Sequence, residues 1–191
     1  MRGSRDDPLA FARPIDLADW LAENHDTSRE LWVRIYKKGS GYASVTWEDC
    51  VVEAIRYGWI DGIKQSGDEK FYLQRLTPRR PGSNWSAKNR EHAERIIEAG
   101  RITPAGLAHV DAARADGRWE TAYGGSATMT MPADFLEALA KRPNAKTFFH
   151  TLDRRNLYAI YYRLQTAKTP ATRARRMEVV LDRLSRGELF H

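Results

Sequence analysis

Hydrophobic and polar positions recur along the chain with two different periods, and these periods predict most of its secondary structure. Residues 31–36 alternate between apolar and other side chains, which is the two-residue period of a strand. The same period predicts a hairpin of two strands, 59–64 and 70–76. A helical period predicts helices over 15–24, 46–57, 85–99, 104–115, 132–140, 144–152, 156–167 and 171–185. Thr46, Thr103 and Thr169 stand where helix N-caps are expected.

The order of these elements predicts an α+β fold. Strands are expected only in the first half of the chain, whereas the pattern from residue 132 onward is helical. We therefore expect a small antiparallel sheet with helices in the N-terminal part and a helical bundle in the C-terminal part. The expected organisation is a flexible lead-in over 1–14, an α+β domain over 15–117, a Gly/Ser-containing connector over 118–131 and a helical domain over 132–191.

Composition narrows the class of protein. The chain has 191 residues, 42% of them hydrophobic and 29% charged, which excludes a collagen, a disulfide scaffold and a largely disordered chain. Its one cysteine, Cys50, lies in an apolar helical pattern, so we expect a buried and unreactive thiol. No stretch approaches the roughly 18 apolar residues that cross a bilayer. The first residues contain no apolar core of a secretory signal, so we expect a cytoplasmic protein.

The positive charge is concentrated at one end of the chain. The net charge is +6, and the segment from Asn144 to His191 holds ten basic and four acidic residues, which accounts for the whole excess. Such an excess favours an anionic partner: nucleic acid, an anionic membrane surface or an acidic protein. The alternative is a helix whose arginines are simply solvated.

A dense group of polar and aromatic residues between positions 59 and 89 is the candidate ligand site. Arg79 and Arg80 lie in a proline-stiffened loop that leads into a predicted helix, where guanidinium groups and free backbone N–H groups can bind an anion. Trp85 could stack on a ring of the ligand. The alternative is that the tryptophans belong to the core and the arginines are solvated. The residues that we assign to this site are Trp59, Arg75, Arg79, Arg80, Asn84, Trp85, Ser86 and Asn89.

The chain carries no familiar catalytic or metal-binding motif. Its five histidines show no i, i+4 pair, and phosphate-loop, dinucleotide, nucleophile-elbow and zinc-protease patterns are absent. We therefore expect no metal and no cofactor. Asp61, between Ile60 and Gly62 and close to Ile63, is a weak candidate for a general base.

Several runs of residues resemble one bacterial family. They are Gly58–Gly62, Arg75–Ser86, Asn89 and Gly100–Gly106, followed by Phe148-Phe149 and Ala167–Arg176. These runs are similar to the YdeI/OmpD-associated family, also described as bacteriocin-protection proteins, over about residues 30–187. The resemblance implies protection against antimicrobial peptides, association with an outer-membrane porin and a helical C-terminal domain. It supplies no catalytic residues, and the expected lack of an export signal departs from a porin-associated protein.

We therefore expect a non-enzymatic bacterial stress or antimicrobial-peptide resistance protein that binds a small anionic ligand or an acidic protein. The alternatives are a nucleic-acid-binding protein, favoured by the sequence pI of about 9.5, and an enzyme that uses Asp61 on a small anionic substrate. Ala167–Arg176 reads as a helix end, a turn and the start of a basic helix. The expected partner-binding residues at that corner are Lys168, Arg173, Arg175 and Arg176. The sequence leaves the oligomeric state open.

Overall fold

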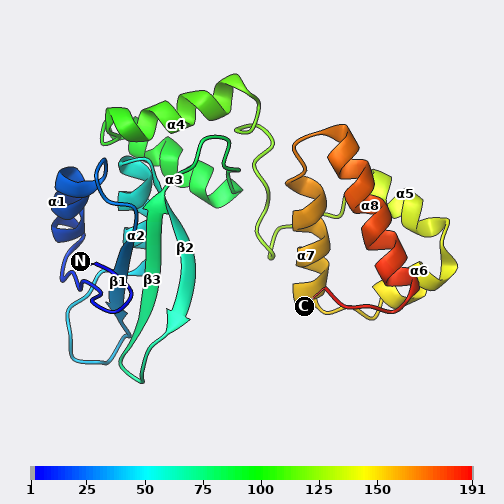
Figure 1. Ribbon diagram of the computed structural model, residues 1–191, viewed down its shortest axis with the longest axis horizontal. Helices are drawn as coiled ribbons and strands as arrows, with labels where there is room; N and C mark the ends of the chain where they lie inside the picture. The colour runs from blue at the N-terminus through cyan, green and yellow to red at the C-terminus, as the bar shows by residue number, and fades with distance from the viewer. Residues whose placement is uncertain (1–2, 191) are drawn as a thin grey trace. The chain divides into compact units, whose positions relative to one another are not determined.

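The structure of the protein, a computed structural model, describes residues 3–190 and confirms the α+β class. This part of the chain forms eight helices and one three-stranded antiparallel sheet (Figure 1). It divides into two compact units. The N-terminal unit contains the chain up to Ser83 together with Asn89–Glu120, and the C-terminal unit contains Asn84–Lys88 and the chain from Thr121 onward. The change of unit after Glu120 falls inside the expected connector, while the predicted domain limits stay predictions.

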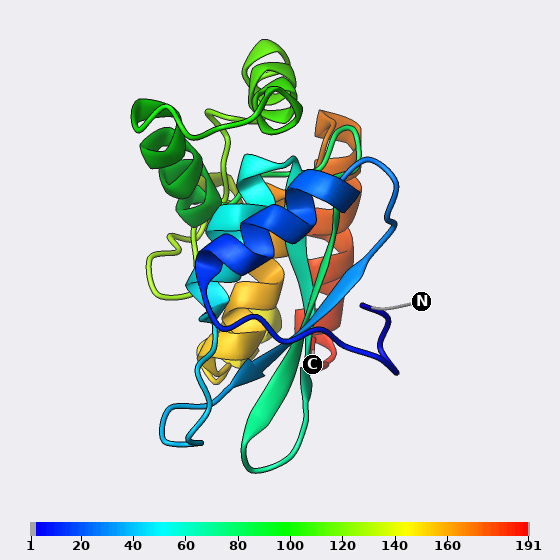
Figure 2. The same cartoon turned by 90° about the vertical axis from the view of Figure 1, so that its left-hand side faces the viewer.

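The sheet of the N-terminal unit has the strand order β1-β3-β2. Its strands are β1 (Leu31–Tyr36), β2 (Trp59–Ser66) and β3 (Phe71–Pro78), all antiparallel to their neighbours. The turn between β2 and β3 extends past the helices that cover the sheet (Figures 1 and 2).

One boundary of the predicted hairpin is wrong. We expected the second strand of the hairpin to end at residue 76, yet Thr77 and Pro78 complete β3 and pair with the start of β2. β1 pairs with β3 only as far as Leu76. Pro78 therefore has a strand on one side only, and its missing N–H group leaves no gap in a ladder.

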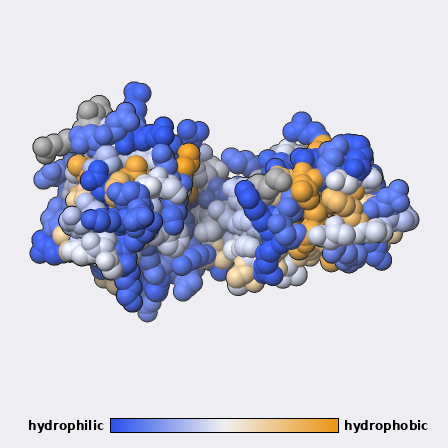
Figure 3. All heavy atoms as spheres, turned by 90° about the horizontal axis from the view of Figure 1, so that it is seen from below, coloured by the Kyte–Doolittle hydropathy of each residue, from blue (hydrophilic) through white to orange (hydrophobic). Residues whose placement is uncertain are grey.

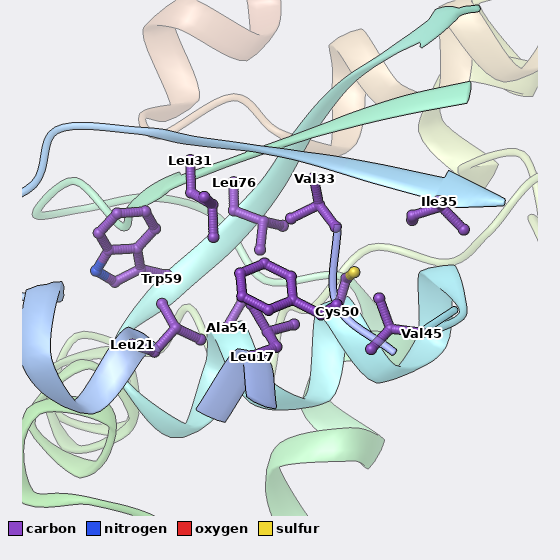
Figure 4. Close-up of a cluster of buried hydrophobic side chains, with 11 residues drawn as sticks. Leu17, Leu21, Leu31, Val33, Ile35, Val45, Cys50, Ala54, Trp59 and Leu76 are labelled. Atoms are coloured by element: carbon purple, nitrogen blue, oxygen red, sulfur yellow. The ribbon is translucent and has the colours of Figure 1, made fainter. Parts of the chain in front are cut away.

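Helices α1 (Pro14–Asn24) and α2 (Trp47–Arg56) cover one face of the sheet. The core between them contains Leu17 and Leu21 from α1, Cys50 and Ala54 from α2, and alternate residues of β1 (Figure 4). Cys50 is fully buried, as expected, and burial raises the pKa of its thiol. The amphipathic spacing of α1, α2 and β1 thus produces one shared apolar layer.

The segment before α1 packs onto the sheet. Leu9 forms a parallel bridge with Val33, its N–H group donates to the carbonyl of Trp32 at 2.9 Å, and Phe11 is buried. This pairing differs from the flexible lead-in that we expected over 1–14, whose first two residues lie outside the described part. Phe11 belongs to the core of the sheet and Leu9 packs against that core, so two apolar side chains attach this segment to the N-terminal unit.

The first turn of helix α4 (Pro104–Ala115) packs against the last turn of α2. Thr103, its N-cap, accepts a hydrogen bond from the N–H group of Gly106 at 3.3 Å. The same hydroxyl donates to the carbonyl of Arg56, at 2.6 Å, so it also caps the end of α2. The preceding helix of this region, α3, spans Ala87–Glu98. The other two predicted N-caps are also confirmed. The hydroxyl of Thr46 accepts a hydrogen bond from the N–H group of Asp49, and that of Thr169 accepts one from the N–H group of Thr172.

The C-terminal unit contains four helices within the described residues: α5 (Ala133–Ala140), α6 (Pro143–Phe149), α7 (Arg154–Gln165) and α8 (Pro170–Ser185). The largest fully buried side chains of the core that these helices form are Phe135, Ile160, Leu164, Leu181 and Leu184. After α8 the chain returns to α7, where the N–H group of Phe190 donates to Oδ1 of Asn156 at 2.8 Å.

Two further observations concern the described residues 3–190. None of their helices combines the length and the apolar character needed to cross a bilayer. Nor do they bring together three or more His, Cys, Asp or Glu side chains in a group that could hold a metal ion.

Candidate functional site

A polar cavity of about 600 Å³ opens in the N-terminal unit where β2 begins and β3 ends. We call it the arginine cavity, because Arg29, Arg75 and Arg80 line it. Arg75 comes from β3 and Arg29 from the loop between α1 and β1, while Arg80 comes from the loop after β3. Its remaining lining residues are Asp26, Thr27, Ser28, Ile60, Thr77, Pro78 and Ser83.

The three guanidinium groups of the arginine cavity differ in their partners. Nε of Arg75 is 2.7 Å from Oε2 of Glu30, an ion pair in which both side chains are more than one-third exposed. The side chains of Arg29 and Arg80 are exposed and make no hydrogen bond or ion pair with any residue in the described part of the chain. Two positive groups in the cavity therefore have unused donors.

The backbone that carries Arg80 is fixed on both sides. The N–H group of Arg79 donates to the carbonyl of Gly58 at 2.9 Å, and that of Ser83 donates to the carbonyl of Arg80 at 3.0 Å. The guanidinium of Arg118 also donates to the carbonyl of Ser83. The proline-stiffened loop thus holds Arg80 at the cavity with little backbone freedom left to lose on binding.

The predicted site residues Trp59 and Arg79 lie elsewhere. Trp59 is 1% exposed, and its Nε1–H donates to the carbonyl of His25 at 3.0 Å. It packs edge-to-face on Trp20. Arg79 is 4% exposed. Trp59 therefore belongs to the core, which was the alternative interpretation of this residue, and Arg79 does not present its side chain to the cavity.

The predicted residues Asn84, Trp85 and Ser86 belong to the C-terminal unit. Trp85 is 2% exposed, and its backbone carbonyl accepts from the N–H group of Tyr123 at 3.0 Å. Ser86 forms a parallel bridge with the same Tyr123. Asn89, assigned to the N-terminal unit, is 8% exposed. The buried indole of Trp85 offers no free face for stacking.

Of the eight predicted ligand residues, the structure thus places Arg75 and Arg80 in the arginine cavity. Sequence reasoning missed Arg29 and its neighbours, which precede β1 by only a few residues. Arg29 is 46 positions away from Arg75 in the sequence, and only the pairing of β1 with β3 brings the two regions together. No local pattern marks such a residue.

The weak catalytic candidate Asp61 is half-buried on β2, where its Oδ2 accepts from Nε1–H of Trp47 at 3.3 Å. The β-bulge between Asp61 and Lys64 follows directly. The side-chain partner of Asp61 is therefore the indole of Trp47.

A second candidate surface is a groove of about 510 Å³ in the C-terminal unit, between α7 and α8. We call it the arginine groove. Two of the predicted partner-binding residues, Arg175 and Arg176, line it; its other lining residues are Tyr162, Arg163, Thr166, Val179, Val180, Arg183 and Phe190.

The other two predicted partner-binding residues are placed differently. Arg173 pairs with Asp134 at the start of α5, at 2.8 Å, and Lys168 is exposed in the turn before α8. The basic corner expected at Lys168–Arg176 is therefore spread over more than one surface. Sequence reasoning missed the groove residue Arg163, because only the packing of α7 against α8 brings it near Arg176.

The surroundings of His109, a half-buried residue of α4 in the N-terminal unit, change the pKa of its imidazole. Burial lowers the pKa of His109, and the positive charges of Arg79 and Arg118 lower the pKa further. The unfolded chain therefore binds a proton at His109 more readily than the folded chain does. The contribution of His109 to the free energy of unfolding is fully present above its unfolded pKa of about 6.5, and it is lost as the pH falls through its folded pKa. We expect the free energy of unfolding to fall less between pH 7 and pH 5 in the His109→Gln variant than in the wild type.

Urea titrations at several pH values measure this difference. If the free energy of unfolding depended on pH in the same way in the wild type and in His109→Gln, the predicted contribution of His109 would be contradicted.

Comparison with protein families divides the chain in two. The profile of a domain of unknown function (DUF8412) matches residues 9–109, and the profile of the family described as "Bacteriocin-protection, YdeI or OmpD-Associated" matches residues 128–187. Comparisons with curated proteins and with solved structures find no significant match. The second profile covers α5 to α8, and therefore the helices that form the arginine groove.

Proposed function

Since the chain belongs to the DUF8412 family, whose profile matches residues 9–109, and its residues 128–187 match the profile described as "Bacteriocin-protection, YdeI or OmpD-Associated", we propose that it protects bacteria against antimicrobial peptides or a related stress. The family's description supports the protective role. We further propose that the protein acts by binding a small anion in the arginine cavity. The observation that carries this proposal is the pair of guanidinium groups, Arg29 and Arg80, that face the cavity without partners among the described residues.

The chemistry of the lining favours an anion with several oxygen acceptors. Guanidinium groups bind phosphate and carboxylate groups through two parallel N–H···O bonds. Hydroxyl groups of Ser28, Thr77 and Ser83 add neutral donors around them. One carboxylate, that of Asp26, also lines the described cavity. It disfavours a second anionic group on that side and can accept a hydrogen bond from a ligand hydroxyl.

The proposal predicts that pyrophosphate, used as a probe, binds to the full chain and that Arg29→Gln with Arg80→Gln weakens this binding about tenfold, on the order of 1.4 kcal/mol. Exposed charges are screened, so each arginine contributes only part of a strong charge-assisted bond. Isothermal titration calorimetry at low salt measures the affinity. The melting temperature should not change, because neither side chain has a partner to lose.

The matched control is Arg5→Gln with Arg155→Gln, which removes two other exposed arginines that have no partner within residues 3–190. It leaves the arginine cavity intact and changes the net charge equally. Equal weakening in both double variants would show that pyrophosphate responds to net charge alone and would exclude the cavity as the site.

A second candidate function, nucleic-acid binding, is favoured by an aromatic surface beside β1. The rings of Tyr36 and Tyr42 stack with centroids 4.6 Å apart, Nζ of Lys70 lies 6.0 Å from the Tyr42 ring, and Lys37 is exposed beside them. Tyr42 itself is 57% exposed. Exposed rings with neighbouring cations are typical of surfaces that bind single-stranded nucleic acids. Tighter binding of an oligonucleotide than of pyrophosphate, unchanged by Arg29→Gln with Arg80→Gln, would favour this function.

A further inference from the structure

The arginine groove has an apolar floor and an apolar rim. Val180 and Phe190, on its floor, are 1% and 7% exposed. Val179 and Tyr162, on its rim, are 54% and 39% exposed, so they extend the apolar surface to the edge of the groove. Figure 3 shows apolar side chains gathered beside hydrophilic ones on the surface of the C-terminal unit, at the right of the view.

The charge around this apolar surface is positive. Arg163, Arg175, Arg176 and Arg183 line the groove, and no acidic residue does so within the described chain. Arg183 is paired with Glu188, but none of the other three arginines contacts a carboxylate of the described residues.

Helix α8 separates its charges by face. Its acidic residues Glu178 and Asp182 both pair with Arg142, which precedes α6. They are therefore engaged away from the groove, and the arginines of α8 that line the groove are not neutralised by their own helix. The positive excess at the C-terminal end of the sequence has its structural counterpart here.

The groove arginines are partly held in place. The guanidinium of Arg176 donates to the carbonyl of Arg163 at 2.8 Å and to Oγ1 of Thr166 at 3.3 Å. Those of Arg163 and Arg183 lie 5.4 Å and 4.6 Å from the centre of the Phe190 ring. These contacts fix the groups over the apolar floor and leave further N–H groups for a ligand. Arg175 is exposed and has no partner among the described residues.

We propose that the arginine groove binds a single amphipathic anion, with a phosphate or carboxylate head against Arg175 and Arg176 and an aliphatic chain along Val179, Val180 and Phe190. A volume of about 510 Å³ is that of a small-molecule site. An inorganic anion would leave the apolar floor exposed to water, and a cationic amphiphile would meet three arginines that have no carboxylate partner among the described residues. A free amphiphile in solution, rather than a bilayer, is the occupant that matches a groove of this size. This proposal goes beyond the anion site of the N-terminal unit and uses none of its residues.

Decyl phosphate, kept below the concentration at which it forms micelles, is the probe for this proposal. We expect it to bind to the full chain at least tenfold more tightly than inorganic phosphate or decyltrimethylammonium, as measured by calorimetry. Val179→Asp should weaken binding of decyl phosphate at least tenfold, and Arg175→Gln about fivefold. Both side chains are exposed, so the variants should fold.

Leu136→Asp and Arg155→Gln are the matched controls, because both residues are exposed in the same unit and neither lines the groove. They should change the affinity less than twofold. Equal effects of the groove and control variants would overturn the proposal, as would equal binding of decyltrimethylammonium. Binding to anionic phospholipid vesicles without binding of monomeric decyl phosphate would overturn the choice of a free amphiphile. Arg29→Gln with Arg80→Gln should leave decyl phosphate binding unchanged, so the failure of one proposal is distinguishable from the failure of the other.

Discussion

Replacing Gly106 with alanine is expected to lower the free energy of unfolding by about 3 kcal/mol. A Cβ atom at this position would overlap the carbonyl oxygen of Arg56 and would lie 2.6 Å from that of Ile55. Both are backbone atoms at the end of α2, so they cannot move aside without separating α2 from α4. Thr103, which bonds both helix ends, would lose its geometry at the same time.

The sign of this change is informative, because alanine is normally the better helix former by about 1 kcal/mol. Urea denaturation followed by circular dichroism measures the loss. Gly125→Ala is the control, since no atom lies within 4 Å of the Cβ position there and its φ angle needs no glycine. A Gly106→Ala variant as stable as the wild type would contradict the close approach of α4 to α2.

The second large effect is expected at Glu53, a buried carboxylate on α2 that is 2% exposed. It accepts hydrogen bonds from the guanidinium groups of Arg56 and, at 2.9 Å, of Arg101. Glu53→Leu removes the acceptor and leaves Arg56, which is mostly buried, without a carboxylate. Breaking a buried pair on one side costs about 3 kcal/mol, because a charge stays buried and uncompensated.

The matched control is Glu94→Leu, which breaks the exposed pair between Arg90 and Glu94 on α3. Such surface pairs contribute about 0.5 kcal/mol or less. Thermal and urea unfolding of both variants give the comparison. Equal losses of unfolding free energy in the two variants would show that the buried ion pairs of Glu53 with Arg56 and Arg101 stabilise the fold no more than an exposed pair does.

The elements of this fold are largely predictable because their signals are local. The alternation at Leu31, Val33 and Ile35 fixes β1, and threonines at 46, 103 and 169 mark three helix starts. The end of β3 is not predictable in this way. Pro78 continues the strand only because β1 has already ended beside it, and that depends on the register of the sheet.

The candidate sites are less predictable because they depend on distant packing. The local run around Arg79, Arg80 and Trp85 suggested one pocket, but Arg79 and Trp85 are buried and do not line the arginine cavity. Arg29 joins Arg75 only through the pairing of two strands, and Arg163 joins Arg176 only through the packing of two helices. Charge composition indicated an anionic partner but not which arginines are free to bind it.

The central claim, that the arginine cavity binds a small anion, is tested most directly by nuclear magnetic resonance of the arginine Nε–H groups during a pyrophosphate titration. We predict that the Arg29, Arg75 and Arg80 signals shift together and reach saturation with one common affinity, whereas the signals of Arg5 and Arg155 stay in place. Uniform small shifts of all exposed arginines, or no saturation at the three cavity residues, would contradict the claim.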